Sequence, residues 1–474
     1  MRILSAVIGC SGLVLATGAL ADVVHWPQWR GPRGDNVAVD QRGPVHFGPE
    51  TNVAWQTEIP AGWSSPVVAG ERIFLTGFTP PTTLAVLCLN RADGRILWRR
   101  PVAAEKIERY FPKLGSPAAP TCATDGTRVV SYFGSAGLVC HDLDGKELWT
   151  VKLPVAKLKD GFGAASSPLI HEGLVYLLRD EDGPAQGLYA FDVVTGKERW
   201  RTSRQEFRVS YGSPVIWDGC VVAIGDTRAK GYDLKTGVER FLVRGLAAYP
   251  CTSPATGADG RLYIATFSHG SQNGDPTPDF EAMIAPLDKD QDGRLSLAEA
   301  TGTMFGDFFA AMDKNQDGFF EKAEWDANNQ WMKQGRNCVI ALRPGGKGDV
   351  TDTHVAWRLE KAIANIASPL AYQGRLYLVR DEGLLALCDT ASGELLLEKE
   401  KLGVTGPTWA SPIAADGKIY VCALSGAVLV LQDGVKPKVI ARAQFPEMIA
   451  ATPCIAGNTL LLRTAKHLWA FPAP

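Results

Sequence analysis

One short pattern recurs along almost the whole of this 474-residue chain and limits what it can fold into. Each copy has a small residue and a proline, a few mostly apolar residues, a turn with glycine, and a second apolar run. Self-similarity at a period of 20 to 50 residues is the sequence signature of solenoids and propellers. The eight opening dipeptides are Ser65-Pro66, Ala119-Pro120, Ser167-Pro168, Ser213-Pro214, Ser253-Pro254, Ser368-Pro369, Ser411-Pro412 and Thr452-Pro453.

The spacing of these units locates an insertion. Successive prolines stand 54, 48, 46, 40, 115, 43 and 41 residues apart, so six intervals average about 45 residues and one carries about 70 more. The long interval belongs to the fifth unit. We therefore expect eight units of one architecture, with a separate module inserted in the fifth.

A second motif within the units predicts their internal structure. A turn glycine is followed four positions later by a large or apolar side chain, as in Gly94 and Trp98, Gly145 and Trp149, Gly196 and Trp200, Gly237 and Phe241, and Gly393 and Leu397. The 49 glycines and 30 prolines of the chain are typical of many short strands and tight turns. Each unit is interpreted as a four-stranded blade, in which the large side chain fills the gap between wedge-shaped sheets. The predicted fold is all-β, an eight-bladed β-propeller of four-stranded blades with a small α-helical insertion in blade 5.

The two ends of the repeat array complement each other. The last unit stops after its third strand, at 467–471, whereas an extra strand containing Trp55 precedes the first unit, at 52–57. Pairing these segments would complete the eighth blade and remove the exposed sheet edges that favour aggregation. We expect the ring to close in this way.

These motifs resemble those of a known family. The run Ala190-Phe191-Asp192, with Thr195-Gly196-Lys197 and Trp200, is similar to the repeat of pyrroloquinoline-quinone (PQQ) type eight-bladed propellers. Quinoprotein dehydrogenases and BamB-type outer-membrane assembly scaffolds share that repeat. The opening segment His25 to Arg33, HWPQWRGPR, is similar to the start of many exported bacterial members. The resemblance covers about 80% of the chain and implies a fold, but fold does not imply activity.

The insertion contains two matches to the twelve-residue calcium loop of an EF-hand. Such a loop places oxygen ligands at positions 1, 3, 5, 7, 9 and 12, where position 7 contributes its backbone carbonyl, and has glycine at position 6. Gly293 and Gly318 occupy position 6. The predicted ligands of two Ca²⁺ ions are Asp288, Asp290, Asp292, Arg294, Ser296 and Glu299 in the first loop, and Asp313, Asn315, Asp317, Phe319, Glu321 and Glu324 in the second.

The connection between the two loops, residues 300–312, is shorter than in a familiar EF-hand pair. The apolar spacing of its second half predicts one helix that leads into the second loop, so the exit helix of the first must be very short. Leu295 and Phe320, both at position 8, are expected to face each other in a short strand pairing. The alternative is an acidic surface insertion that binds no metal.

The first 21 residues are typical of a secretory signal peptide, because an uncharged stretch after Arg2 ends in the small-x-small pattern Ala19-Leu20-Ala21. An exported protein, periplasmic or secreted, is predicted. A lipoprotein anchored at Cys10 and an uncleaved anchor are the alternatives. The predicted domains are the signal peptide (1–21), the propeller (22–270 and 336–474) and the insertion (271–335).

The remaining nine cysteines are an odd number without a CxxC pair, and Cys88 and Cys422 lie in apolar strand-like runs. Cysteine in such a run is interpreted as a small buried hydrophobe. Because nine is odd, the disulfide pairing of the mature chain is left open.

Repeat alignment brings three aromatic and three arginine side chains to one face of the propeller. A rim of this composition would hold a planar anionic ligand by stacking and by bidentate hydrogen bonds. The alternative is that the arginines brace neighbouring loops and the aromatics pack between blades. The candidate residues are Trp63, Arg179, Tyr211, Arg380, Trp409 and Arg463.

The function predicted from these features is a calcium-binding scaffold for a ligand or a protein partner. With 49 basic and 51 acidic residues the chain lacks the positive charge of a nucleic-acid-binding protein. It contains no nucleophile elbow, phosphate loop, HExxH or dinucleotide motif, and no catalytic residue is assigned. The alternative that the resemblance implies is a PQQ-dependent alcohol or sugar dehydrogenase, although the vicinal cysteine pair frequent in those enzymes is missing.

Overall fold

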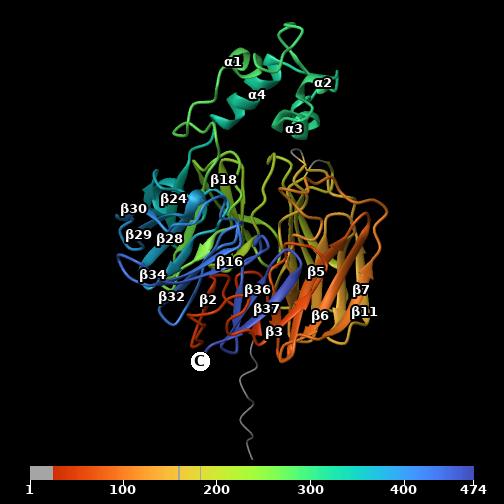
Figure 1. Ribbon diagram of the computed structural model, residues 1–474. Coiled ribbons are helices and arrows are strands. Elements are labelled where there is room, and N and C mark those ends of the chain that lie inside the picture. The colour runs from red at the N-terminus through yellow and green to blue at the C-terminus, as the bar shows by residue number, and fades with distance from the viewer. Residues whose placement is uncertain (1–24, 159–160, 182) are drawn as a thin grey trace, which may run out of the picture.

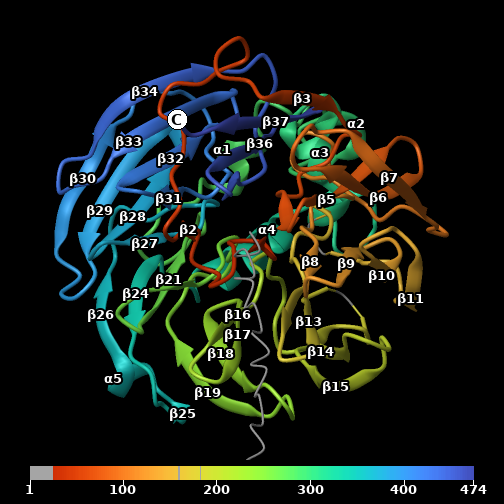
Figure 2. The same cartoon turned by 90° about the horizontal axis from the view of Figure 1, so that it is seen from below.

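The computed structural model describes residues 25–158, 161–181 and 183–474. It is a mainly-β, eight-bladed β-propeller with a few short helices (Figures 1 and 2). The blades follow one another in chain order around the ring, so that the first and last blades are neighbours (Figure 2). Within the described ranges, no helix is both long and apolar enough to cross a membrane. The predicted signal peptide and Cys10 lie outside these ranges.

Each blade is an antiparallel sheet whose first strand is the shortest and lies nearest the central axis. Blades 1 to 4 consist of β4 (Val67–Ala69), β5 (Arg72–Thr79), β6 (Thr83–Asn90) and β7 (Ile96–Val102); β8 (Ala123–Thr124), β9 (Arg128–Phe133), β10 (Gly137–Asp142) and β11 (Glu147–Lys152); β12 (Leu169–His171), β13 (Leu174–Arg179), β14 (Gly187–Asp192) and β15 (Glu198–Ser203); and β16 (Val215–Trp217), β17 (Cys220–Gly225), β18 (Arg228–Asp233) and β19 (Glu239–Arg244).

The second half of the ring repeats this order, with the strand of blade 8 that lies outermost supplied by the N-terminal region. Blades 5 to 8 consist of β20 (Ala255–Thr256), β21 (Leu262–Thr266), β24 (Cys338–Leu342) and β26 (Val355–Leu359); β27 (Leu370–Tyr372), β28 (Arg375–Arg380), β29 (Leu384–Asp389) and β30 (Leu395–Lys401); β31 (Ile413–Ala415), β32 (Lys418–Cys422), β33 (Ala427–Gln432) and β34 (Lys438–Gln444); and β35 (Cys454–Ala456), β36 (Thr459–Arg463), β37 (His467–Pro472) and β3 (Trp55–Glu58).

The remaining elements are short. Three two-residue strands extend blades: β1 (His25–Trp26) pairs with β4, β2 (Val37–Ala38) with β31, and β25 (Gly348–Asp349) with β19. The others are α1 (Phe280–Ile284), β22 (Leu295–Ser296), α2 (Leu297–Ala300), α3 (Met304–Met312), β23 (Phe319–Phe320), α4 (Lys322–Met332), α5 (Thr351–His354) and the 3₁₀ helix η1 (Asp381–Gly383).

The ring closes as the sequence predicts. Strand β3 pairs antiparallel with β37, and Trp55 lies opposite Ala470. Arg463, at the end of β36, joins blade 8 to blade 1, because its guanidinium donates hydrogen bonds to the carbonyls of Ser64, Thr76 and Pro60. First and last blades are therefore held by a strand pairing and by a buried cation that is shared across the junction.

The glycine and tryptophan of the repeat form the joint between neighbouring blades. The Trp55 ring covers Gly94 of the next blade so closely that a Cβ on Gly94 would lie 2.3 Å from it, and Gly94 has a φ of +72°. The indole N–H of Trp55 donates a hydrogen bond to the carbonyl of Arg91, at 3.0 Å. Trp98, Trp149, Trp200 and Trp357 cover Gly145, Gly196, Gly237 and Gly393 in the same way. Only glycine allows both the left-handed turn and the contact, which explains why the two residue types recur together.

The core of each blade consists of strand residues that alternate toward its two neighbours. Cys88 of β6 and Cys422 of β32 are among these buried residues, at 0% and 1% exposure. Their interpretation as small hydrophobes is confirmed. Burial also raises the pKa of the Cys88 and Cys422 thiols to about 12, so neither is a reactive thiolate.

All four helices α1 to α4 lie between β21 and β24 of blade 5. These two strands pair directly, with Thr266 opposite Cys338 at the point where the intervening segment leaves the blade. The helices stand above one end of the propeller (Figure 1). The blade is thus complete without them, and the segment between its second and third strands is placed over one face of the ring.

Candidate functional site

The segment over the propeller face contains two helix–loop–helix units with a small core of their own. Its core residues are Phe280, Ile284, Leu295, Ala300, Phe309 and Phe320. Strands β22 and β23 pair, with Leu295 opposite Phe320, so the predicted pairing is confirmed. The four-residue α2 followed by the nine-residue α3 also agrees with the predicted short exit helix and longer entering helix.

The first predicted calcium loop brings three carboxylates together. One carboxylate oxygen from each of Asp288, Asp290 and Asp292 lies within 4.8 Å of the other two. Oδ2 of Asp288 accepts a hydrogen bond from the N–H of Gly293 at 3.0 Å, whereas its Oδ1 is buried without a hydrogen-bond partner. Like charges this close repel one another unless a cation lies between them. This cluster is therefore a possible cation site.

Glu299, at position 12, folds back over the same loop. Its carboxylate accepts hydrogen bonds from the N–H groups of Lys289 and Ser296, at 2.8 and 2.9 Å, and from the Ser296 hydroxyl, at 2.7 Å. These hydrogen bonds, that from the Ser296 hydroxyl foremost, lower the pKa of Glu299 to about 2. The group is thus an ionised oxygen donor throughout the physiological pH range.

The second loop holds its side chains at positions 1 and 12 as the first loop does. The N–H of Gly318 donates to Asp313 at 3.0 Å, as that of Gly293 does to Asp288. Glu324 accepts from the N–H groups of Lys314 and Glu321, at 2.5 and 3.1 Å, as Glu299 does from Lys289 and Ser296. Two side-chain ligand positions differ: at position 3 the amide of Asn315 replaces a carboxylate, and at position 9 Glu321 replaces Ser296. Both loops therefore hold their acidic side chains in one common backbone framework.

The two helices that flank the second loop both contact the propeller. On α3, the ring of Phe308 lies 4.8 Å from that of Phe111 and 5.6 Å from that of Phe162, between centroids. On α4, the Trp331 ring lies 6.1 Å from that of Tyr249 and beneath the guanidinium of Arg208, at 4.0 Å. The helices on both sides of the second loop are therefore packed against the propeller.

Below these contacts a cavity of about 270 Å³ occupies the propeller axis. Trp63 and Trp409, from blades 1 and 7, line one side, with ring centroids 5.3 Å apart. Phe162, Tyr211 and Tyr249, which precede the inner strands of blades 3, 4 and 5, line the opposite side. Successive rings on that side are 5.7 and 5.6 Å apart. The cavity therefore lies between two aromatic walls.

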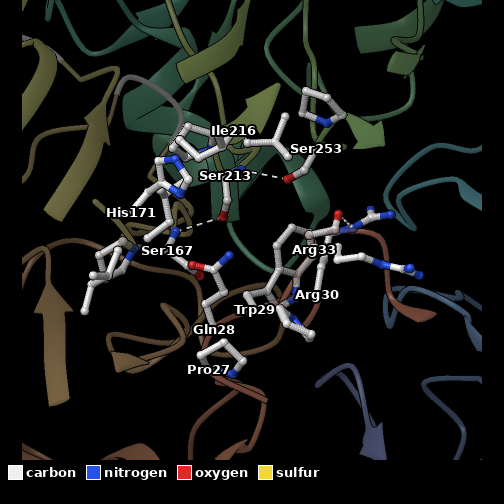
Figure 3. A pocket seen from close by; sticks show the side chains of 18 residues that line it. Pro27, Gln28, Trp29, Arg30, Arg33, Ser167, His171, Ser213, Ile216 and Ser253 are labelled. Carbon is white, nitrogen blue, oxygen red and sulfur yellow. Dashed lines mark hydrogen bonds between the residues drawn. The ribbon is translucent and has the colours of Figure 1, made fainter. Parts of the chain in front are cut away.

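A ring of hydroxyl groups surrounds the same cavity, one from each blade. In seven cases the residue's backbone N–H donates to the hydroxyl of the next blade, at 2.7 to 3.0 Å. Figure 3 shows two of these bonds, from Ser167 to Ser213 and from Ser213 to Ser253. The ring consists of Ser65, Thr121, Ser167, Ser213, Ser253, Ser368, Ser411 and Thr452.

This ring corrects the repeat register in the second blade. The sequence pattern aligns Ala119-Pro120 with the other opening dipeptides, but Thr121 is the residue that occupies the ring position, two residues before β8. The hydroxyl determines the register, because the inter-blade hydrogen bond needs an acceptor there. The following proline is dispensable, and Cys122 replaces it.

The N-terminal segment closes the cavity on the side away from the helices. Trp29 lines both this cavity and a second one of about 240 Å³. Figure 3 shows Trp29 among the residues that line the second cavity. Arg30 is 2% exposed and donates to the carbonyls of Gly34 and Pro369, at 3.0 and 2.7 Å. The tryptophan-rich opening motif therefore places a floor across the channel.

The six predicted rim residues divide into two groups. Trp63, Tyr211 and Trp409 line the cavity, whereas Arg179, Arg380 and Arg463 do not. Arg179 is 3% exposed, forms an ion pair with Glu181 and donates to the carbonyl of Pro154. Arg463 is 1% exposed and joins blades 8 and 1. The expected combination of stacking rings with arginine forks at one ligand is not formed, and Arg179 and Arg463 brace the framework instead.

Several residues of the site carried no recognised signal in the sequence. Phe162, Tyr249, Phe308 and Trp331 lie in connections or in the insertion, outside the aligned repeat positions. Two signals were available in the sequence. Trp29 belongs to the opening motif HWPQWRGPR, and Phe308 lies in the predicted helix that leads into the second loop.

A buried carboxyl group anchors the connection that carries Phe111. Glu108 is 2% exposed and accepts hydrogen bonds from the N–H of Ala164 at 2.7 Å and from the Ser135 hydroxyl at 3.1 Å. Burial raises the pKa of Glu108 to about 7, although the hydrogen bonds from Ala164 and Ser135 act in the opposite direction. Between the pKa of the unfolded chain and about pH 7, the folded state keeps a proton on Glu108 that the unfolded state has lost. The stability that this group contributes is therefore fully present below the pKa of the unfolded chain and is lost as the pH rises through about 7.

We therefore expect a pH-dependent difference between the native protein and Glu108→Gln. Between about pH 5 and pH 8 the free energy of unfolding of the native chain should fall relative to that of the variant by on the order of 3 kcal/mol. Denaturant titrations of both proteins at the two pH values measure the difference. A constant difference between them would show that Glu108 keeps the same charge in folded and unfolded states.

Fold and site together define an eight-bladed β-propeller with a helical segment over an aromatic axial cavity. A family model described as "Outer membrane protein assembly factor BamB" matches residues 85–241, about a third of the chain. No curated protein matches.

Solved structures agree in fold at low sequence identity. BamB from Moraxella catarrhalis is 14% identical, with 88% of this chain and 100% of that chain covered and a TM-score of 0.52. The computationally designed Ika8 protein is 10% identical, with 89% and 99% covered and a TM-score of 0.54. A europium-containing methanol dehydrogenase is 12% identical, with 95% and 98% covered and a TM-score of 0.51. An assembly factor, a designed protein and an enzyme share the architecture, so the architecture alone assigns no function.

Proposed function

We propose that this protein is an exported, calcium-binding propeller scaffold. Its insertion, residues 271–335, holds two Ca²⁺ ions in EF-hand loops, and its axial cavity receives a ligand or a segment of a partner protein. The signal peptide at 1–21 directs it to the periplasm or the exterior. The propeller, residues 22–270 and 336–474, is the binding body.

The observation that carries this proposal is the equivalence of the two loops. Each has a carboxylate at positions 1, 5 and 12, a glycine at position 6, and the same N–H donors to positions 1 and 12. Ca²⁺ takes six to eight oxygen ligands in flexible geometry, which this framework supplies from side chains and the carbonyl at position 7. The matching family model, described as an outer-membrane assembly factor, supports a protein as the partner.

The quinone-dependent dehydrogenase is the weaker alternative. A planar anionic quinone needs positive or metal-bound groups beside its stacking rings. No charged side chain belongs to the cavity lining in the part of the chain that the structure describes, and the three rim arginines lie outside it. The residues present therefore do not fit that cofactor, and we derive no reaction from it.

Calorimetry tests the calcium sites. We expect two Ca²⁺ per chain, with dissociation constants between about 10⁻⁷ and 10⁻³ M, the range of sensor and extracellular modules. Because Glu at position 12 is bidentate, Glu299→Gln and Glu324→Gln should each weaken one site at least about tenfold, and the double variant both.

The matched control is Glu198→Gln, which removes an exposed carboxylate from the outer strand of blade 3. It should bind calcium as the native protein does. Unchanged stoichiometry and affinity in the double variant would reject the assignment of the loops.

A further inference from the structure

The hydroxyl ring presents unused hydrogen-bond donors to the axial cavity. Seven of its eight oxygens accept a backbone N–H, and in the described ranges none of the eight hydroxyls donates to another group. A hydroxyl has one O–H donor besides its acceptor lone pairs. A ligand in this cavity therefore meets a circle of donors and is favoured if it carries several oxygen acceptors.

The walls above the ring select for apolar faces. The Trp63 and Trp409 pair faces the rings of Phe162, Tyr211 and Tyr249 across the axis, from blades on opposite sides of the propeller. Aromatic faces carry negative charge density and attract the positively polarised hydrogens of C–H groups. A ligand with C–H faces and a rim of oxygens would satisfy walls and ring together.

The charge of the lining excludes ionic ligands as the best fit. An anion would find no basic side chain among the described lining residues. A quaternary ammonium ion would be attracted to the aromatic faces, but it has no acceptor for the hydroxyl ring. An uncharged, oxygen-rich ring compound is the class that uses both features.

We infer that the axial cavity is a binding site for a sugar residue, stacked between the aromatic walls and hydrogen-bonded to the hydroxyl ring. The volume of about 270 Å³ is near the lower end for small-molecule pockets, roughly 300 to 1,000 Å³, so one sugar unit enters rather than a long chain. Trp29 blocks the far side, so the unit enters from the face beneath α3 and α4. This inference rests on the ligand-binding half of the proposed function and names its ligand class.

Titration calorimetry of the calcium-loaded full chain with glucose, galactose, N-acetylglucosamine and maltose tests this inference. Binding at millimolar or lower concentration is expected for at least one of them. Trp409→Ala, which removes half of one wall, should weaken that binding at least about tenfold. Ser65→Ala should weaken sugar binding less, because it removes only one hydroxyl donor. Ser65 is chosen because its hydroxyl oxygen, unlike the other seven of the hydroxyl ring, accepts no backbone N–H from a neighbouring blade.

The control variant is Leu148→Ala, an exposed residue on the outer strand of blade 2, which should bind sugar as the native chain does. Choline and benzoate serve as cationic and anionic probes. Failure of all four sugars, preferential binding of either ion, or full binding by Trp409→Ala would overturn the inference. Calcium titration of the same samples separates the two proposals, because intact calcium binding without sugar binding rejects the sugar site alone.

Discussion

A chain that lacks residues 25–62 is expected to lose its stable monomeric fold. The deletion removes β3, leaving β37 as an unpaired edge in blade 8, and removes Trp55 from its joint with Gly94. Loss of a buried tryptophan alone costs about 3 to 5 kcal/mol, and an unpaired strand edge invites aggregation. We expect a decrease of more than about 5 kcal/mol in the free energy of unfolding, or aggregation, measured by denaturant unfolding and light scattering.

The matched control removes a longer segment without opening the ring. Residues 271–335 are replaced by a short glycine-containing turn, which is feasible because Thr266 and Cys338 are already paired. This variant should remain monomeric and unfold near the native midpoint. If the chain without 25–62 also unfolded at the native midpoint as a monomer, ring closure by β3 would not be what stabilises the propeller.

Removal of calcium is expected to loosen the insertion and, through it, the mouth of the cavity. Without the ions the carboxylates of both loops repel one another, so hydrogen exchange within residues 280–332 should increase strongly. Since α3 and α4 contact Phe111, Phe162 and Tyr249, exchange around those residues should increase as well. The midpoint of propeller unfolding should change little, because no predicted calcium ligand lies in a blade.

The two loops provide a matched pair of variants for this coupling. Glu324→Gln disables the loop whose flanking helices contact the propeller, whereas Glu299→Gln disables the other. In the native protein, hydrogen exchange at the cavity mouth should increase when a chelator is added. In Glu324→Gln it should already be increased without chelator. In Glu299→Gln without chelator the increase should be much smaller. Protection changes confined to residues 271–335 under all conditions would show that the insertion binds calcium without affecting access to the cavity.

The features that the sequence determined by itself are the local and the repeated ones. Blade number, ring closure through Trp55 and the position of the additional segment follow from a pattern repeated eight times, in which each copy confirms the others. The spacing around Gly293 and Gly318 is equally local, because one short backbone loop holds every side chain concerned. For this reason the pairing of Leu295 with Phe320 and the short α2 were predicted correctly, whereas calcium itself stays a prediction.

Only the tertiary structure decided how side chains from different blades combine around the axis. Repeat alignment placed arginines and aromatic residues at one face. In the folded chain, however, Arg179 and Arg463 are buried and bind acceptors in neighbouring loops and blades instead of facing the cavity. The cavity was then lined by rings such as Phe162 and Tyr249 from connections without a repeat pattern, and by a hydroxyl circle whose register in blade 2 depends on Thr121. These contacts join residues far apart in the chain, so their geometry exists only once the ring has closed.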